Sequence, residues 1–382
     1  MSSGTRSALT TVLQTIRQHS PVSRASLTRM TGLSPSVVST STKQLLERGL
    51  LEEHGIHQDT LGRPQVLLKI NPSHAVAFGM ALTWSGLHAV MTDLEGTVLA
   101  SHAVPLVSDA PDQVIAQCVA EMAELRKQHK VRNKDIAGVG LALPGWIDSE
   151  TGTCLKSTVH GWNGVQFRPL LEDALGYPAF VENDANALAV GEKWFGLAKH
   201  YENYAVVTLV DGIGAGIYTY NQLYRGSRGA TGEFGHINIA IDGPACTCGK
   251  RGCLEALASI PALLQQAAAA GLPADLPGLT AAAVSGDPKA QAVFETAGRY
   301  IGYALSTLNH ILDLQAIIIT APADYLNPYL KEALEVSYRD NSVLFADTRM
   351  DILYQEEDSD IWALGAASLA IQAFYERGGV IR

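Results

Sequence analysis

The 382-residue sequence lacks any hydrophobic run of the roughly 18 residues that are needed to cross a bilayer. Its first residues, MSSGTRSALT, also lack the apolar core of a signal peptide. We therefore expect a soluble protein that resides in the cytoplasm and has no membrane partner.

Cysteine is scarce, because the chain contains only five, and three of these lie within eight residues: Cys246, Cys248 and Cys253. An odd number with such a cluster fits reduced thiols or a metal site better than a disulfide framework. With 47% hydrophobic residues, a chain of this length can bury the cores of two or three domains.

Acidic residues are missing from the start of the chain, and none precedes Glu47. Residues 1–70 contain eight Lys and Arg against four Asp and Glu, a net charge of +4, which leaves −14 for the remaining residues. The first segment can therefore approach a polyanion that the rest of the chain would repel.

Three helices are expected before residue 50. The first has an apolar face formed by Leu9, Val12, Leu13 and Ile16. Ser23 can cap the second helix, and Gly32 provides the left-handed residue for the turn that follows. Ser34 and a first-turn proline begin the third helix, which stops at Gly49.

A helix, a glycine turn and a second helix form the helix-turn-helix pattern, whose second helix enters the major groove of DNA. The third helix should bury Val37, Val38, Ser41, Leu45 and Leu46. Its outer face is small and polar, and the expected DNA contacts from it are Ser34, Ser36, Ser39, Thr40 and Lys43.

Two short strands, LLEEHG and QVLLKIN, should form a wing whose tip inserts Arg63 into a minor groove. The alternative is a three-helix bundle that serves dimerisation, with its basic residues merely solvated. Charge asymmetry, cap positions and the wing together favour a winged helix-turn-helix over residues 1–72, with Asn71-Pro72 as the hinge to the body.

The rest of the chain, which we call the body, has the sequence pattern of an α/β protein. From Ala75 onward, apolar segments alternate with helical stretches, and the clearest strands are AVAFGMALT, IAGVGLALPG, YAVVTLV and QAIIIT. These runs fit buried strands of mostly parallel sheets.

Six blocks of the body resemble the ROK family of sugar kinases and repressors: GVGLALPGWID, VENDANALAVGE, GIGAGI, GATGEFGH, CTCGKRGCLE and ALGAASLA. The resemblance covers essentially the whole chain and implies an α/β fold, with the winged helix-turn-helix followed by a two-lobed actin-like, ribonuclease-H-like ATPase-type body. The implied lobes are residues 73–183, completed by a helix at about 362–382, and residues 184–361. The N-terminal helix-turn-helix places the chain with the family's repressors.

One histidine and three cysteines occur in the pattern His-x9-Cys-x-Cys-x4-Cys: His236, Cys246, Cys248 and Cys253. An imidazole and three thiolates make a closed tetrahedral shell that is typical of structural zinc. The family resemblance implies the same four ligands, so we expect one structural Zn²⁺ per chain. The alternative is a loop that holds three reduced cysteines without a metal.

The resemblance also implies a sugar site, lined by Asn183, Asp184, Glu233, His236 and Glu255, with Gly145 and Thr158 near its edge. In the family's kinases the position of Asp184 is the general base, so Asp184 is a vestigial base here. His236 could serve both sites through its two ring nitrogens. The alternative is that the ENDAN block only caps a helix.

The three nucleotide-binding loops of the family's kinases are all altered. The first is replaced by Ala81, Thr83, Trp84 and Ser85, where we expect the indole to fill backbone space. The second carries Val210 and Asp211, and its remaining glycines should serve a tight strand turn. The third reads Thr320-Ala321-Pro322 instead of a glycine pair. A carboxylate about 4 Å from a phosphate oxygen is repelled by about 1 kcal/mol even in water, so we expect no working ATP site.

The sequence therefore predicts a sugar-responsive transcriptional regulator, a repressor of carbohydrate uptake or catabolism genes, and not an enzyme. Its effector should be a monosaccharide or a sugar phosphate, and a homodimer or tetramer should bind a palindromic operator. Two alternatives stay open: an ATP-dependent ROK sugar kinase with an added DNA-binding domain, and a protein whose body docks a transport or signalling protein.

Overall fold

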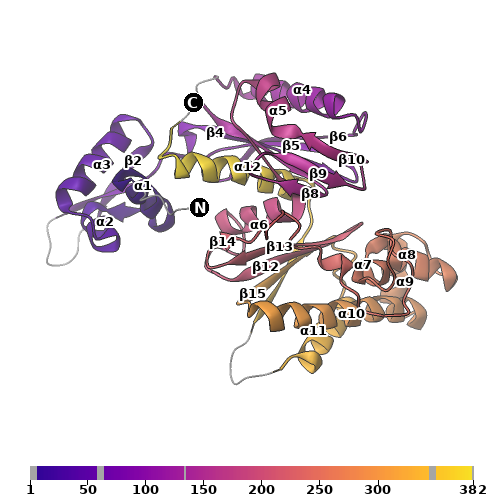
Figure 1. Cartoon of the computed structure of the whole chain (residues 1–382). Helices are drawn as coiled ribbons and strands as arrows, with labels where there is room; N and C mark the ends of the chain where they lie inside the picture. Colours follow the sequence, from indigo (N-terminus) through magenta and orange to yellow (C-terminus); the bar gives the residue numbers. More distant parts are fainter. Residues whose placement is uncertain (1–6, 58–63, 133–134, 344–349, 381–382) are drawn as a thin grey trace. The chain divides into compact units, whose positions relative to one another are not determined.

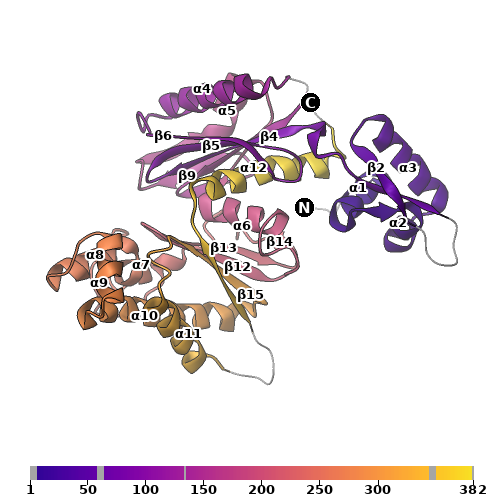
Figure 2. The same ribbon diagram turned by 180° about the vertical axis from the view of Figure 1, so that it is seen from behind.

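The protein's structure, a computed structural model, describes residues 7–57, 64–132, 135–343 and 350–380. The chain forms two compact units. Unit 1 contains Met1–Pro144, Ser149–Glu182 and Trp362–Arg382, and unit 2 contains Gly145–Asp148 and Asn183–Ile361. Figures 1 and 2 show their elements from opposite sides. Among the described residues, none of the helices has the length and hydrophobicity to span a bilayer.

The start of unit 1 is the expected winged helix-turn-helix. Its elements are α1 (Ala8–His19), β1 (Val22–Ser23), α2 (Arg24–Thr31), α3 (Pro35–Glu47), β2 (Leu51–His57) and β3 (Gln65–Ile70). Ser23 and Ser34 cap α2 and α3 through their side chains, and Gly32 is left-handed with φ of 68°, which confirms these three predictions. The strands pair antiparallel in the order β1-β3-β2. Arg63, at the expected wing tip, lies outside the described residues.

The buried face of α3 differs in part from the prediction. Val38, Ser41 and Leu45 are buried, but Val37 is 37% exposed, so its predicted inward position is wrong. The buried positions follow a spacing of three to four residues, and Val37 lies about 90° around the helix from the centre of the face that they form. Thr42 is buried instead, and it accepts a hydrogen bond of 3.0 Å from Nε of Arg24.

The rest of unit 1 contains a five-stranded sheet in the order β11-β7-β4-β5-β6. Its strands are β4 (Val76–Thr83), β5 (Gly86–Thr92), β6 (Val98–Val104), β7 (Ile136–Leu143) and β11 (Ala179–Asn183). The other elements are η1 (Pro72–His74), α4 (Pro111–His129), β9 (Thr153–Ser157), β10 (Trp162–Gln166), α5 (Phe167–Leu175) and α12 (Ser359–Glu376). Helices α4 and α5 lie on one face of the sheet, and α12 lies on the other (Figure 1).

The small residues of α12 lie directly against the sheet. A Cβ atom added to Gly79 of β4 would come within 1.9 Å of the Ala363 carbonyl oxygen, and one added to Gly140 of β7 within 1.8 Å of the Ala366 carbonyl oxygen. The helix backbone therefore packs on two strand positions that have no side chain, which fixes α12 on the central strands.

The end of α12 also contacts the winged helix-turn-helix. The guanidinium of Arg48 donates hydrogen bonds to the backbone carbonyls of Gly378, at 3.1 Å, and Gly379. Gly379 is left-handed, and a Cβ atom there would come within 2.3 Å of Leu50. The buried guanidinium of Arg17 lies 5.9 Å from the centre of the Tyr375 ring. The DNA-binding domain is thus packed against the last turn of the C-terminal helix.

The segment between the winged helix-turn-helix and the body is itself hydrogen-bonded. The side chain of Asn71 donates to the Gly49 carbonyl at 2.9 Å and accepts from the Ser73 backbone N–H at 3.2 Å. Beyond η1, the backbone N–H of Leu94 donates to the Pro72 carbonyl at 3.2 Å. These hydrogen bonds connect the segment to the winged helix-turn-helix on one side and to the body on the other.

Unit 2 contains a second five-stranded sheet, in the order β14-β13-β12-β15-β16. Its strands are β12 (Tyr204–Leu209), β13 (Ile213–Thr219), β14 (Gln222–Leu223), β15 (Ala316–Ala321) and β16 (Asp351–Glu356), and β8 (Trp146–Asp148) is separate from it. The helices are α6 (Asp184–Trp194), η3 (Phe234–His236), α7 (Leu254–Ala258), α8 (Ile260–Ala269), α9 (Leu276–Val284), α10 (Pro288–Leu312) and α11 (Pro328–Asn341). Helix α6 lies on one face of this sheet, and α10 and α11 lie on the other (Figures 1 and 2).

The two sheets share one topology. In each, three strands form an antiparallel meander, β4-β5-β6 and β12-β13-β14. In each, the next strand of the sheet runs parallel to the first strand of the meander, β7 beside β4 and β15 beside β12. This repeated arrangement is that of a two-lobed, ribonuclease-H-like body, as the sequence predicted.

The sequence predicted that the glycines of the GIGAGI block form a tight turn, but most of them lie in a strand. Gly214 and Gly216 lie within β13, and only Gly212 lies in the turn that joins β12 to β13. A Cβ atom on Gly216 would come within 2.4 Å of the Ala185 carbonyl oxygen in α6. These glycines therefore permit close packing of a helix on the sheet, a requirement that the sequence alone does not reveal.

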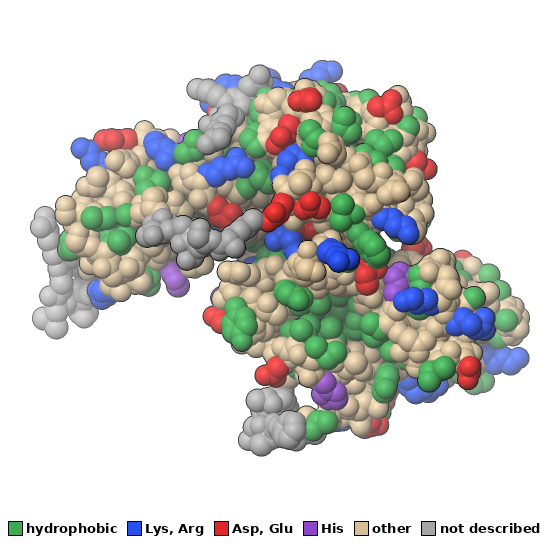
Figure 3. Space-filling model, viewed as in Figure 1, with side chains coloured by type: hydrophobic (Ala, Val, Ile, Leu, Met, Phe, Trp, Pro, Cys, Tyr) green, Lys and Arg blue, Asp and Glu red, His purple; other side chains and the backbone are tan. Residues whose placement is uncertain are grey.

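Charged side chains are scattered over the face shown in Figure 3. Acidic and basic side chains occur there singly or in small groups, with hydrophobic side chains between them. On this face the negative charge of the body is thus spread out rather than collected in one patch.

Candidate functional site

One histidine and three cysteines of unit 2 meet in a single cluster. The ligand atoms of His236, Cys246, Cys248 and Cys253 all lie within 4.8 Å of one another. Nδ1 of His236 is 3.6 Å from Sγ of Cys246, and Sγ of Cys248 is 3.7 Å from Sγ of Cys253. A tetrahedral ion with metal–sulfur bonds of about 2.3 Å places neighbouring sulfur atoms about 3.8 Å apart. The cluster therefore has the dimensions of a four-coordinate metal site.

Short backbone hydrogen bonds shape the cysteine loop. The N–H of Cys246 donates to the Lys250 carbonyl at 2.8 Å, and the N–H of Gly249 donates to the Cys246 carbonyl at 3.0 Å. The backbone N–H of Lys250 lowers the pKa of the Cys248 thiol, whereas burial raises the pKa of the Cys253 thiol to about 12. A metal that binds here must therefore displace the proton of Cys253.

His236 presents its two ring nitrogens to different groups. Nδ1 faces the cysteine sulfur, and Nε2 lies 3.8 Å from Oε2 of Glu233. The other oxygen of Glu233, Oε1, accepts a hydrogen bond of 2.7 Å from the indole N–H of Trp146. His236 thus connects the cysteine cluster to a carboxylate that an indole holds in place. Trp146 was not predicted, although it follows Gly145 in a block that the resemblance had marked.

Asn183 and Asp184 lie at the N-terminus of α6. Oδ1 of Asn183 accepts from the Asn186 backbone N–H at 3.1 Å, and its amide donates to the Gly145 carbonyl at 3.1 Å. Asn183 therefore caps α6, which is the role that the alternative interpretation of the ENDAN block predicted. Oδ1 of Asp184 accepts from the Ala185 N–H at 2.8 Å.

The carboxyl group of Asp184 has an unusual environment. Burial raises its pKa to about 6, and the nearby charge of Glu233 acts in the same direction. Asp184 is therefore only partly ionised just below neutral pH. A carboxylate of this kind can accept hydrogen bonds from a neutral hydroxylated ligand at neutral pH and loses that capacity in acid.

Glu255 lies between the His236–Cys253 cluster and the turn after β12. Its Oε1 is 4.0 Å from Nδ1 of His236 and accepts from the Thr247 hydroxyl at 3.2 Å. Its Oε2 accepts from the Ile213 backbone N–H at 3.3 Å. Thr158, the remaining candidate for the sugar site, is an exposed residue of unit 1 between β9 and β10. The other six candidates belong to unit 2.

The positions that replace the first nucleotide loop form the turn between β4 and β5. Ala81 is buried in β4, but Trp84 is 75% exposed, so the expectation that its indole fills backbone space is wrong. The hydroxyl of Ser85 is 2.9 Å from that of Thr83 and 2.7 Å from Nε2 of the buried His88. These hydrogen bonds hold the turn on its protein-facing side, and the indole of Trp84 extends into solvent.

In unit 2 the other two loops also carry the altered residues. Asp211 occupies the exposed turn after β12, and Ala321 is buried at the end of β15 and followed by Pro322. Proline has no N–H group to offer a nucleotide.

The polar face of α3 is exposed as predicted. Ser36, Ser39, Thr40 and Lys43 are all accessible, and Lys43 forms an exposed ion pair of 3.8 Å with Glu47. Ser34 accepts from the Val37 N–H at 3.4 Å and is occupied as the helix cap.

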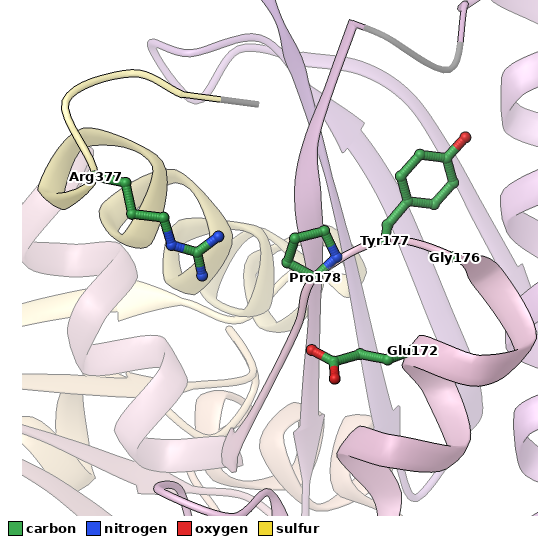
Figure 4. A pocket seen from close by; sticks show the side chains of 5 residues that line it. All are labelled: Glu172, Gly176, Tyr177, Pro178 and Arg377. Carbon is green, nitrogen blue, oxygen red and sulfur yellow. The ribbon is translucent and has the colours of Figure 1, made fainter. Parts of the chain in front are cut away.

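A hollow of about 520 Å³ in unit 1 is shown in Figure 4, where the guanidinium of Arg377 extends from the end of α12 toward Pro178. Arg377 lies 5.1 Å from the Phe180 ring, and Glu172 accepts from the Ala179 N–H at 3.0 Å. No predicted site residue lines this hollow.

Comparison with known proteins identifies the family. Residues 84–373 match the ROK family. The chain is 30% identical over 367 residues to the xylose repressor of Bacillus subtilis (strain 168), covering 96% of this chain and 95% of the repressor. It is 27% identical over 375 residues to the DNA-binding transcriptional dual regulator NagC of Escherichia coli (strain K12), covering 95% and 91% of the two chains.

Solved structures agree with these relatives. A ROK family transcriptional regulator, a homologue of the E. coli MLC protein, superimposes with a TM-score of 0.84 at 29% identity and covers 97% of this chain and 96% of its own. A ROK family glucokinase from Streptomyces griseus, solved with glucose and AMPPNP, has a TM-score of 0.67 at 29% identity and covers 78% of this chain and 100% of its own. The chain therefore belongs to the ROK family, and it is a transcriptional regulator of that family rather than one of its sugar kinases.

Proposed function

We propose that this regulator represses genes for carbohydrate uptake or catabolism and that its effector is a monosaccharide or sugar phosphate bound in unit 2. The observation that carries the proposal is the group of Asp184, Glu233 and His236 beside the metal cluster, in a chain that also carries a winged helix-turn-helix. Sugar hydroxyls need convergent acceptors and donors, and these side chains supply both. The relatives include a xylose repressor and, at 27% identity, an N-acetylglucosamine repressor of Escherichia coli O157:H7, so xylose and N-acetylglucosamine are the first sugars to test.

The proposed metal is one structural Zn²⁺ per chain, held by His236, Cys246, Cys248 and Cys253. Four protein ligands complete the tetrahedral shell and leave no position for a reactive water. The ion would fix the orientation of His236, whose Nε2 then remains on the side of Glu233 as a donor for an effector hydroxyl.

Helix α12 is the proposed link between effector and DNA. The helix begins in unit 2 and passes into unit 1 at Trp362, and its end carries the carbonyls that Arg48 binds. A change that the effector causes in unit 2 would therefore reach the DNA-binding domain through this helix. Couplings of this kind are typically worth about 1 to 3 kcal/mol, or about 5- to 150-fold in DNA affinity.

The proposed DNA target is a palindromic operator bound by a homodimer or a tetramer. The polar residues Ser36, Ser39, Thr40 and Lys43 would reach base edges in the major groove, and Arg63 would enter a minor groove. A two-fold protein matches a two-fold operator, which is why we propose an even number of chains.

A pair of experiments tests the proposal. Thermal-shift screening of sugars and sugar phosphates should identify an effector, since a ligand at 100 times its dissociation constant stabilises the native state by about 2.7 kcal/mol. Gel shifts on DNA fragments selected by the protein should then show weaker binding with that effector, and Glu233→Gln should abolish the response. The proposal fails if no sugar stabilises the protein, or if a stabilising sugar leaves DNA affinity unchanged.

A further inference from the structure

Val37 is an exposed apolar residue at the start of the second helix of the helix-turn-helix. Helices α1, α2 and α3 lie entirely within the described part of the chain, and of their large hydrophobic side chains only Met30 and Val37 are exposed, at 54% and 37%. Met30 lies in the last turn of α2, whereas Val37 lies in the first turn of α3. The first residues of a recognition helix are those that meet base edges in the major groove. Val37 is therefore the better placed of the two to touch a base.

The folding of the domain does not call for a valine at this position. Val37 lies outside the buried face of α3, which is formed by Val38, Ser41, Thr42 and Leu45. The helix cap uses only the backbone N–H of Val37, which any residue except proline supplies. A β-branched residue is also a weaker helix former than alanine, so an exposed valine here adds no helical stability. These observations direct attention to binding.

The position of the Val37 side chain is well defined. Its backbone N–H donates to Oγ of Ser34 at 3.4 Å, which fixes the first turn of α3. The hydrogen bond of 3.0 Å from Nε of Arg24 to the Thr42 hydroxyl joins α3 to the start of α2. A valine in a helix has one strongly preferred χ1 rotamer, so its two methyl groups lose little freedom when they contact a ligand.

The residues beside Val37 on the exposed face of α3 are small and uncharged. Ser36 precedes it and Thr40 lies one turn further on, and both are exposed. Lys43 follows six residues later and forms its ion pair with Glu47. Small neighbours allow the helix backbone to come close to base edges. Since a valine side chain has no donor or acceptor, it cannot recognise the polar groups of a base, and the C5-methyl of thymine is the apolar group that the major groove offers.

We propose that Val37 recognises a thymine of the operator through its C5-methyl group and so sets one base preference of this regulator. The inference rests on the proposed binding of an operator by α3, and it adds the identity of one base and of the side chain that reads it. Val37 and Lys43 lie roughly 9 Å apart along the helix axis, at about 1.5 Å per residue. Because one base pair occupies about 3.4 Å, the thymine should lie within about three base pairs of any base that Lys43 contacts.

Replacement of single thymines by deoxyuridine tests the proposal, because this change removes the methyl group and leaves the polar groups of the base in place. An operator is first selected from random DNA by the full chain, and each thymine is then replaced in turn. Gel-shift titrations give the affinity of the wild-type chain, Val37→Ala and Val336→Ala for every substituted operator. Val336 lies on α11 and is 42% exposed, so it is a matched helical valine outside the DNA-binding domain.

At one thymine position the wild-type chain should lose about fourfold in affinity without the methyl group, which corresponds to about 0.8 kcal/mol for one buried carbon. Val37→Ala should bind the unmodified operator about fourfold more weakly and should not respond to the methyl at that position, while its response at other thymines is kept. Its thermal unfolding should not be lowered, and its salt dependence should match that of the wild type because no charge is removed. Val336→Ala should behave as the wild type throughout.

Contrary results separate this inference from the proposed function. If the wild-type chain prefers its operator but Val37→Ala keeps every response to a missing methyl, Val37 does not read a thymine, and the regulator stands. If Val37→Ala weakens binding equally on all DNA, with and without the methyl groups, the side chain acts through folding or assembly and the inference is wrong. If the wild-type chain binds random DNA as tightly as any selected fragment, the proposed function and this inference both fail.

Discussion

The guanidinium of Arg48 donates a hydrogen bond of 3.1 Å to the backbone carbonyl of Gly378, which lies 330 residues further along the chain. The contact joins the end of helix α3 to the end of helix α12. Gly378 and Gly379 follow Glu376, the last residue of α12, and their carbonyls accept charge-assisted hydrogen bonds from the guanidinium, which are stronger than hydrogen bonds between neutral groups. The DNA-binding domain is therefore held by the element that also crosses the central strands of unit 1.

Arg48→Ala should loosen this attachment. We expect the free energy of unfolding of unit 1 to fall by about 1 to 2 kcal/mol, because the backbone carbonyls lose a charged donor. The effector should also lose part of its influence on DNA affinity, since the hydrogen bonds from Arg48 are lost while the contacts of Arg17 and Leu50 with the C-terminal segment remain. Urea denaturation and gel shifts with and without the effector measure the two effects. Arg132→Ala, which removes an exposed ion pair with Asp135, is the matched control and should change neither.

Removal of one cysteine should disturb the effector site as well as the metal site. In Cys248→Ser the zinc content should fall from about one ion per chain to well below one, because a hydroxyl is a poor zinc ligand. Sugar affinity should fall with it, since His236 is no longer fixed opposite Glu233. Elemental analysis and calorimetry measure these quantities, and Cys118→Ser, at a buried thiol outside the cluster, controls for general damage. A wild-type protein purified without chelator that carries no zinc would contradict this prediction.

The raised pKa of Asp184, about 6, gives a dependence on pH with a definite sign. Because the folded pKa lies above that of the unfolded chain, ionisation of Asp184 costs stability as the pH rises through about 6. The neutral isostere in Asp184→Asn should therefore raise the free energy of unfolding by about 1 to 3 kcal/mol at pH 7.5, and the gain should vanish near about pH 4. Urea titrations across this range measure it, with Asp242→Asn, an exposed carboxylate, as the control.

Sugar binding should follow the same titration. About one tenth of Asp184 is ionised one pH unit below its pKa, so the affinity for the effector should fall about tenfold between pH 7.5 and pH 5. An affinity that is independent of pH over this range would mean that Asp184 does not accept a hydrogen bond from the sugar.

No sugar-dependent ATP turnover is expected, because Ala81, Trp84, Asp211 and Ala321 occupy the places where a nucleotide would be held. A coupled kinase assay across common hexoses and pentoses tests this expectation. Turnover in the usual range of about 1 to 1000 per second that disappears in Asp184→Asn would establish an enzyme instead.

Lys43→Ala separates two ways of contacting DNA. If Lys43 touches a base, the loss should be about 1 to 3 kcal/mol at one operator position, whereas a phosphate contact would weaken all sequences alike and reduce the salt slope by about one. Gel shifts at two salt concentrations distinguish these cases, and Lys156→Ala, in β9 of unit 1, is the control. Binding that is unchanged on every sequence would remove Lys43 from the interface.

The sequence by itself determined the local elements. The caps at Ser23 and Ser34, the left-handed Gly32, the buried strands and the His-Cys spacing depend on neighbours within a few residues, and such short-range preferences are legible in a single chain. The order of the ROK blocks likewise identified the fold, because each block is a contiguous stretch.

Only the tertiary structure decided which distant residues meet. Trp146 holds Glu233 across 87 positions, Arg48 binds the end of α12, and Gly216 admits the backbone of α6. The exposure of Trp84 also depends on the hydroxyls and the histidine beneath its turn, not on the turn's own composition. Each of these features arises from packing between elements that are far apart in the chain, and a pattern of neighbouring residues contains no information about such packing.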